Sequence, residues 1–328
     1  MAECPKFEHL LVIPKVRVQN ANAISSSLTH GFPAITAFLG LMWALERKMA
    51  ALELDLRFKA VGVVCHDYQE QITREGSHTH TFCLTRNPLI IKEGKVASAP
   101  IVEEGRIHLE ISLIFAFQSG RLTNEFVSPE VLEKIAADVF EVLENMHIAG
   151  GSILYASFMP SRQRPYIVSL TGTKQDCVQC FQQLKYRLLP GFALVARDDL
   201  LEERYMTLRA ENPETSRLDA WLSLSRINAR YTEQAGWEDD RNGWIVPIPV
   251  GYSVLSGPHE PGTVSSARDD NVPFCFVESV YSIGQWLSPH RLQSPQQLLW
   301  YAASNPLLYR CHNDFRISLP EQEDYDFD

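Results

Sequence analysis

The segment between Val18 and Gly40 carries a run of small polar side chains. They are Gln19, Asn20, Asn22, Ser25, Ser26, Ser27 and Thr29. A run of this kind is unsuited to a protein core, because its amides and hydroxyls would all need buried partners. It offers many hydrogen-bond donors with little bulk, which suits a ligand rich in oxygen atoms. The alternative is a well-capped loop between a strand and a helix.

A second group of chemically active side chains lies in the segment 65–83. Its members are Cys65, His66, His78, His80 and Cys83. If the segment folds back as a hairpin, three or four of them could converge on a metal ion, although their spacing matches no standard zinc finger. The alternative is a set of surface histidines. The same histidines could act as general acid and base in RNA cleavage, so a metal-independent endoribonuclease is the alternative function.

The remaining motifs indicate no cofactor. Cys177 and Cys180 form a single CxxC within a predicted helix, and since zinc needs four ligands we expect buried or half-buried thiols. The sequence has no Walker loop, no GxGxxG after a strand, no GxSxG elbow and no HExxH. Their absence argues against an ATPase, a dinucleotide enzyme, a serine hydrolase or a zincin. We therefore expect a protein without cofactor or metal.

Several arginines stand next to polar or aromatic residues, where a guanidinium could grip a phosphate with two hydrogen bonds. They are Arg86, Arg106, Arg187, Arg197, Arg226 and Arg291. Each alone is more often a solvated or salt-bridged surface group. Trp286, close to His290 and Arg291 in the sequence, could stack on a base. The alternative is that Trp286 is packed at a corner of the fold and binds no ligand.

The spacing of apolar residues predicts the elements that position these groups. Strands are expected from Leu11 to Val18, from Lys59 to Cys65 and from Ile107 to Phe117, where apolar and polar residues alternate or form short apolar runs. A helix that Pro33 could start has apolar residues at helical spacing from Ile35 to Met49. A second helix, with Ser128 as its N-cap, is expected over 129–146, followed by strands over 152–158 and 166–170.

This order predicts an α+β fold of the ferredoxin-like (RRM-like) kind, an antiparallel sheet with two helices on one face. We expect this domain to occupy residues 1–172, with residues 66–105 inserted as a hairpin-like excursion. Residues 173–328 should form a less regular module rich in helices and loops, with helices over 174–186, 198–210, 216–228 and 295–302. Residues 317–328 form an acidic tail.

Composition and charge limit the possible partners. Hydrophobic content of 45% and charged content of 21% are typical of a folded protein. No signal peptide and no apolar run long enough to span a bilayer is apparent, and seven unpatterned cysteines fit reduced thiols, so we expect a cytoplasmic protein with no membrane partner. The net charge of −10 weakens a nucleic-acid hypothesis. However, five of the last eight residues are acidic, which leaves −5 for the rest.

Several ordered motifs between Leu11 and Tyr301 together resemble one family. They are QNANAISSSLTHGFPAITAFLG, LTRNPL, IVEEGRIHLEISL, AGGSIL, RLLPGFALVAR, GWIVPIPVGY, FVESVYSIGQWLSPHR and LLWY. The chain resembles the Cas-five-type subunit of the type I-F CRISPR surveillance complex, also called the Csy complex.

The resemblance implies a non-catalytic RNA-binding subunit that holds the five-prime handle of the crRNA. Its partners would then be the large subunit and the backbone subunit of the complex, and target double-stranded DNA near the PAM through the assembled complex. One branch of the wider group cleaves precursor crRNA, but type I-F complexes use a separate endonuclease. The chain departs from the family pattern at Ser27, where proline is common, and at His30, which therefore receives no role beyond stacking or packing.

A repeat-derived handle has a fixed sequence, so side chains can read its unstacked bases while fixed donors hold its phosphates. Asn20 and Asn22 suit base edges or sugar hydroxyls, the amides and hydroxyls of Ser25 to Ser27 suit phosphates, and Phe32 suits stacking. The expected RNA-binding residues are Gln19, Asn20, Asn22, Ser25, Ser26, Phe32, Arg86, Asn87, Arg106, Arg197, Trp286, His290 and Arg291.

Overall fold

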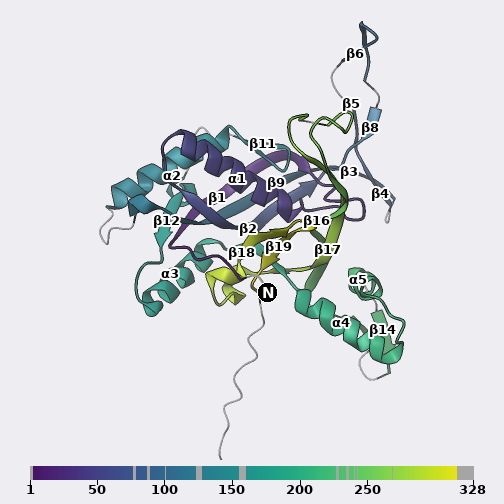
Figure 1. Ribbon diagram of the computed structural model, residues 1–328. Coiled ribbons are helices and arrows are strands. Elements are labelled where there is room, and N and C mark those ends of the chain that lie inside the picture. The colour runs from purple at the N-terminus through teal and green to yellow at the C-terminus, as the bar shows by residue number, and fades with distance from the viewer. Residues whose placement is uncertain are drawn as a thin grey trace, which may run out of the picture.

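A large antiparallel sheet with five α-helices organises the described part of the chain (Figure 1). The computed structural model describes residues 3–76, 79–86, 89–99, 101–122, 128–154, 160–226, 229–233, 236–239, 241, 243–267 and 269–315. Within them, 11 strands form one sheet, in the order β10-β11-β1-β9-β2-β13-β17-β16-β19-β18, with β12 also paired to β1. Within the same residues, no helix combines the length and apolar character needed to cross a lipid bilayer.

The first half supplies the elements that alternation and helical spacing predict. They are β1 (His9–Asn22), α1 (Ile35–Ala51), β2 (Arg57–Glu70), β9 (Arg106–Gln118), α2 (Pro129–Glu144), β11 (Gly151–Ile153) and β12 (Tyr166–Ser169). The short strand β10 (His147–Ile148), which pairs with β11, was not predicted. Strand β1 pairs antiparallel with β9, β11 and β12, and β9 pairs antiparallel with β2. β2 extends five residues beyond the predicted end at Cys65, because Asp67 to Glu70 continue the ladder with β9.

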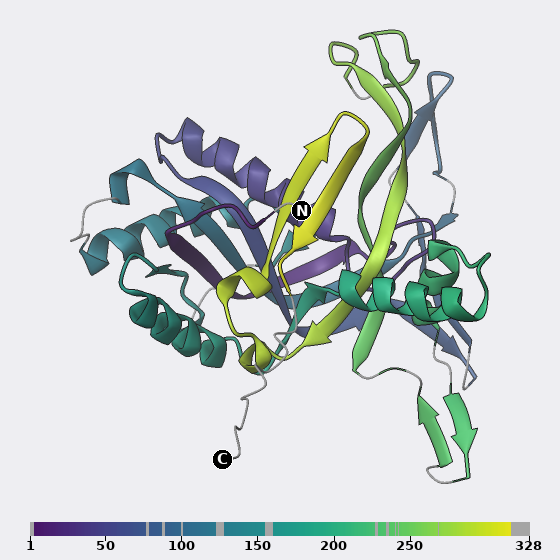
Figure 2. The ribbon, with the colours of Figure 1, turned by 60° about the horizontal axis from the view of Figure 1, so that its bottom comes forward.

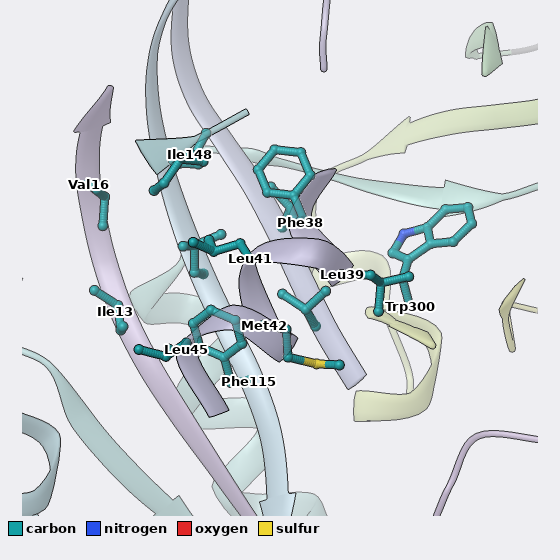
Figure 3. Close-up of a cluster of buried hydrophobic side chains, with 14 of the residues drawn as sticks. Ile13, Val16, Phe38, Leu39, Leu41, Met42, Leu45, Phe115, Ile148 and Trp300 are labelled. Atoms are coloured by element: carbon teal, nitrogen blue, oxygen red, sulfur yellow. The ribbon is translucent and has the colours of Figure 1, made fainter. Parts of the chain in front are cut away.

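Helices α1 and α2 pack on one face of this sheet and form the main core with it (Figures 1 and 3). Side chains of α1 lie between Ile13 of β1, Phe115 of β9 and Trp300 (Figure 3). The predicted apolar stripe of α1, from Ile35 to Met49, is buried. α1 begins two residues later than predicted: Pro33 is itself buried before the helix, and Ala34 is the N-cap without a side-chain cap.

The excursion between β2 and β9 is built of short paired strands (Figure 1). They are β3 (Ile72–Glu75), β4 (Thr79–Phe82), β5 (Leu84–Arg86), β6 (Ile90–Lys92), β7 (Lys95–Ala97) and β8 (Ile101–Glu103). β3 pairs with β4, β5 with β8, and β6 with β7. Short paired strands thus occupy the described part of the segment predicted as a hairpin-like excursion, and they start after Glu70 rather than at His66.

The second half contains more strand than predicted. Its helices are α3 (Lys174–Arg187), α4 (Asp198–Glu211) and α5 (Arg217–Ser225), and its strands are β13 (Phe192–Ala196), β14 (Ala229–Thr232), β15 (Gly236–Asp239), β16 (Trp244–His259), β17 (Phe274–Leu287), β18 (Leu299–Asn305) and β19 (Leu308–Asn313). The long β16–β17 hairpin projects from the body of the molecule (Figure 2). β13 and β18 both pair with β2, so the main sheet continues across the boundary placed near Gly172.

Two predictions for this half were wrong. The segment 295–302 is not a helix: only the one-turn η4 (Pro295–Gln297) is helical, and Leu299 starts a strand whose first three residues are fully buried. The irregular, loop-rich character expected of this half is also wrong for the segment from Trp244 to Pro249, which despite its two prolines is the start of strand β16. Its register against β17 shifts directly after Pro249, where a bulge accommodates the break.

The face of the sheet opposite α1 and α2 is only partly covered. α3 packs there on Leu10 and Val12 of β1 and Ala116 of β9. The uncovered part of this face lies at the other ends of these strands, around residues 15–20, 106–112 and 66–70.

Candidate nucleic-acid interface

The loop that leads from β1 into α1 is held by its own hydrogen bonds. The hydroxyls of Ser25 and Ser26 each lie 2.7 Å from Oγ1 of Thr29. The backbone amides of both serines donate to the carbonyl oxygen of Thr29, at 3.1 and 3.2 Å. Thr29 itself is buried. These two amides were predicted to bind phosphates, but both already donate hydrogen bonds within the loop. The same bonds hold the loop in a preformed conformation.

Asn22 fixes the start of this loop. Its side chain bonds both backbone groups of Ile24: Nδ2 donates to the carbonyl oxygen at 2.8 Å, and Oδ1 accepts from the amide at 3.0 Å. Its own amide donates to Ala149 O at 2.9 Å, and that of Ala23 donates to Gly105 O at 2.9 Å. The Asn22 side chain is thus engaged in shaping the loop, although the residue is exposed.

Asn20 and Arg106 are brought together at the ends of β1 and β9. Asn20 has a positive φ of 57°, and the register of β1 against β9 shifts between Val18 and Ala21. Its carbonyl oxygen accepts from Nη1 of Arg106 at 3.4 Å, and the same guanidinium pairs with Glu104 at 2.6 Å. The Asn20 amide donates to Nδ1 of His108 at 3.1 Å, so the proton of a neutral His108 ring sits on Nε2. This kink gathers an amide, a guanidinium and an imidazole on one surface.

A hollow of about 240 Å³ adjoins this kink on the open part of the sheet. Its polar lining comes from Arg17 and Gln19 of β1, Asp67 and Gln69 of β2, and His108 and Glu110 of β9. Of these only Gln19 was a predicted site residue. Arg17 and His108 were visible in the sequence as polar positions of alternating strands, but alternation shows only that a residue faces away from the core, not that neighbours converge there.

Phe32 and Trp286 belong to an aromatic cluster beside the loop. The Phe32 ring stacks on Phe38, with centroids 5.6 Å apart, and meets the edge of Trp286 at 4.9 Å. Trp286 is only 9% exposed and is part of the main core. The alternative of a packed corner is thus the better description of Trp286, and half-buried Phe32 presents only part of its ring to a ligand.

Three of the predicted residues lie apart from the loop. Arg197 is buried, pairs with the exposed Asp199 at 2.8 Å and donates to the side chain of Gln285, so its guanidinium is already engaged and is not a free surface phosphate ligand. His290 and Arg291 are exposed in the one-turn η3 (Pro289–Arg291). η3 packs against α3, where the Lys185 ammonium donates to the carbonyl oxygens of His290 and Leu292. The structure thus groups Gln19, Asn20 and Arg106 around the loop, and leaves these three outside that group.

Parts of the predicted site fall outside the described residues. Asn87, His78 and the acidic tail 317–328 are among them. Arg86 ends strand β5, and only its backbone is described.

His66, the first candidate for acid–base chemistry, has both ring nitrogens occupied. Nδ1 lies 2.5 Å from the carbonyl oxygen of Pro190, to which it must donate, and Nε2 lies 2.7 Å from the hydroxyl of Ser112. Ser112 is buried, and burial lowers the pKa of His66. His80 lies exposed on β4, away from these bonds. Among the residues that the structure describes, no three His, Cys, Asp or Glu side chains form a group that could hold a metal ion.

The lone CxxC of α3 carries free, half-buried thiols. Cys177 Sγ donates to the carbonyl oxygen of Leu170 at 3.1 Å, which ties the start of the helix to the end of β12. This agrees with the structural interpretation of the pair.

Comparison with known proteins places the whole arrangement in one family. The family model described as CRISPR-associated protein (Cas_Csy2) matches residues 11–311. The chain is 42% identical over 312 residues to the CRISPR-associated protein Csy2 of Pseudomonas aeruginosa (strain UCBPP-PA14), covering 91% of this chain and 93% of that protein. The motifs of the resemblance, from the loop that follows β1 to the segment Leu298–Tyr301, lie within the matched range. The chain therefore belongs to the Csy2 family of CRISPR-associated proteins.

Proposed function

We propose that this chain is a non-catalytic subunit of a type I-F CRISPR surveillance complex, where it holds the repeat-derived five-prime handle of crRNA. One observation carries the proposal: the preformed loop after β1 and the kink at Asn20 present Gln19, Asn20, Arg106 and His108 on one surface. Such a surface can read base edges and hold phosphates of an unstacked strand.

The order of the first half supports an RNA-binding role. In the sheet, β11 and β12 lie beside β1, followed by β9 and β2, with α1 and α2 on one face. We interpret this order as a ferredoxin-like unit, an architecture that also underlies RNA-recognition modules. Because α3 covers part of the opposite face, the RNA would lie at the ends of β1 and β9 rather than across the whole sheet.

The negative net charge of the chain implies that RNA binding depends on partner subunits. With a net charge of −10, the protein has few cations to offer a polyanion, so the isolated chain should bind RNA poorly. In this proposal, tight binding arises with the large subunit and the backbone subunit of the complex. The assembled complex would then meet target double-stranded DNA near the PAM.

The proposal is tested by co-expressing the chain with the other subunits and a CRISPR array, then sequencing the RNA that copurifies. We expect crRNAs to be enriched with the wild-type chain and strongly reduced with the triple variant Gln19→Ala, Asn20→Ala, Arg106→Gln. Recovery of random cellular RNA, or of none, would overturn the proposal.

Arg57→Gln is a matched control for this experiment. Arg57 pairs with Asp55, two residues before it, as Arg106 pairs with Glu104. It lies at the far end of the same strand pair, opposite Gln118. The control should leave the amount of crRNA unchanged. If both changes reduce crRNA equally, general charge rather than the kink governs binding.

The alternative of a metal-independent endoribonuclease makes a separate prediction. Because Nε2 of His66 faces a buried serine, His66 is badly placed as a general acid or base. Incubating the purified chain with repeat-containing precursor RNA in the presence of EDTA should leave the RNA intact. Cleavage that is abolished by His66→Asn or His80→Gln would establish the ribonuclease instead.

A further inference from the structure

An aromatic cleft opens where strands β2 and β13 part. The two strands pair only at Cys65 with Phe192 and at Val64 with Ala193. Beyond Cys65, β2 continues with β9 as far as Glu70. A hollow of about 340 Å³ lies at this divergence, and residues 30–32 of the polar loop form part of its wall.

Five aromatic rings line this cleft, and four of them are linked by ring contacts, with Tyr68 as the fifth. They are Phe32, Tyr68, Phe192, Trp244 and Trp286. Trp244 meets Phe192 at 5.8 Å and Trp286 at 6.1 Å between ring centroids. Tyr68, Phe192 and Trp244 are 55%, 44% and 48% exposed. Three large aromatic side chains exposed around one hollow indicate a surface that is covered in use.

The polar groups of the cleft are acidic. Asp67 and Glu70 both line it, and Glu70 accepts a hydrogen bond from His30 at 3.1 Å. Among the described residues that line it there is no lysine or arginine. His66 is also in the lining, but its two ring nitrogens are occupied by Pro190 and Ser112. A phosphate group would meet carboxylates here without a compensating cation, so the charge disfavours a nucleotide.

The combination of aromatic faces and carboxylates favours a cation. Aromatic rings attract a guanidinium through their negative faces, and arginine stacks on such rings while it donates to carboxylates. Arginine together with tryptophan and tyrosine is also enriched among the residues that dominate protein interfaces.

We propose that this cleft binds an arginine side chain that a partner protein inserts between Trp244 and Tyr68, with Asp67 and Glu70 as its anionic partners. The occupant is a protein, so this inference stands independently of the RNA-binding proposal. The two surfaces adjoin each other, because Asp67 and Tyr68 line both the hollow beside the kink and this cleft. The proposal assigns the kink at Asn20 and Arg106 to RNA and the cleft to a protein.

The test uses the full-length chain without RNA, with its tryptophan indoles labelled with nitrogen-15 for NMR. The probe is the peptide acetyl-Gly-Arg-Gly-amide, and its control is the citrulline peptide, which has the same shape without the charge. The Trp244 signal is assigned by its loss in Trp244→Phe. We expect the arginine peptide to shift this signal saturably, with binding about fivefold weaker for citrulline and for the double variant Asp67→Asn, Glu70→Gln.

Three outcomes would overturn the proposal. Equal binding of the arginine and citrulline peptides would remove the role of charge. Tighter binding of cytidine or adenosine monophosphate than of the arginine peptide would make the cleft a base pocket. A Trp244 signal that shows no saturable shift would mean that the cleft takes no arginine. Since RNA is absent from all of these measurements, each outcome leaves the crRNA experiment unaffected.

Discussion

Nε2 of His66 lies 2.7 Å from the hydroxyl of Ser112, so a histidine at the rim of the cleft is bonded to a serine in the core. Nδ1 of the same ring donates to a backbone carbonyl oxygen, which leaves Nε2 as the acceptor of the serine proton. The Ser112 hydroxyl oxygen in turn accepts from the Lys15 amide at 3.0 Å. The ring is therefore held in its neutral form.

This bond predicts a pH dependence of stability. Burial lowers the pKa of His66 from its ordinary value of 6.5, so below that pH the unfolded chain takes up a proton that the folded ring resists. The free energy of unfolding should fall as the pH drops from 6.5 toward the lower folded pKa. His9 and His312 are shifted in the same direction and add to this slope.

Urea unfolding between pH 7.5 and pH 5 measures the effect. His66→Gln should give a shallower decline of the free energy of unfolding with falling pH than the wild type. Equal slopes for the two proteins would show that His66 titrates alike in the folded and unfolded states.

Gly151 sets the close approach of β11 to the kink in β1. A Cβ atom there would lie 2.7 Å from both the amide nitrogen of Ala21 and the carbonyl oxygen of Gln19, and neither backbone atom can move aside easily. Gly151→Ala should therefore lower the free energy of unfolding by about 1–3 kcal/mol. It should also reduce the crRNA that copurifies, because the displaced strand carries Gln19 and Asn20.

Gly40→Ala is the control for this change. Gly40 is exposed on α1, and no heavy atom lies within 4 Å of its added Cβ. Alanine there should raise the stability by about 0.5–1 kcal/mol through helix propensity. If both variants shift the urea midpoint in the same direction, the packing at Gly151 is not the cause.

Lys185 is a buried cation that holds η3 in place. Its ammonium donates to Leu292 O at 2.6 Å and to His290 O at 3.3 Å, and burial lowers its pKa. Lys185→Met would leave both carbonyl oxygens without this donor, and we expect a loss of about 1–3 kcal/mol in the free energy of unfolding. Lys174→Met, at an exposed position of the same helix, should change it little. Equal effects of the two substitutions in urea unfolding would contradict a structural role for the buried ammonium.

The sequence predicted the elements whose burial follows a simple period. The stripe from Ile35 to Met49 and the alternation from Ile107 to Leu113 each put one set of apolar side chains in the main core, so a single pattern determines both element and orientation. The prediction of secondary structure was wrong for the segment 295–302, where the side chains of Leu298 to Tyr301 are all buried. A continuous apolar run fits a buried helix and a buried strand equally well.

The site could be predicted only in part, because its residues are brought together by the pairing of strands that are far apart in the sequence. Gln19 and Asn20 were found from their polarity. Arg106 was one of several arginines, and nothing local separated it from Arg197, which the fold buries in an ion pair with Asp199. The aromatic cleft could not be predicted from the sequence, because Tyr68, Phe192 and Trp244 line one hollow only where β2 and β13 diverge.

The most direct test of the central claim is a site-specific cross-link in the assembled complex. A crRNA carrying 4-thiouridine at single handle positions would be irradiated in the complex, and the cross-linked peptides of this chain identified by mass spectrometry. We expect cross-links to peptides containing residues 17–32 or 104–108. Cross-links from every handle position to other subunits, or to peptides of this chain distant from the kink at Asn20, would contradict it.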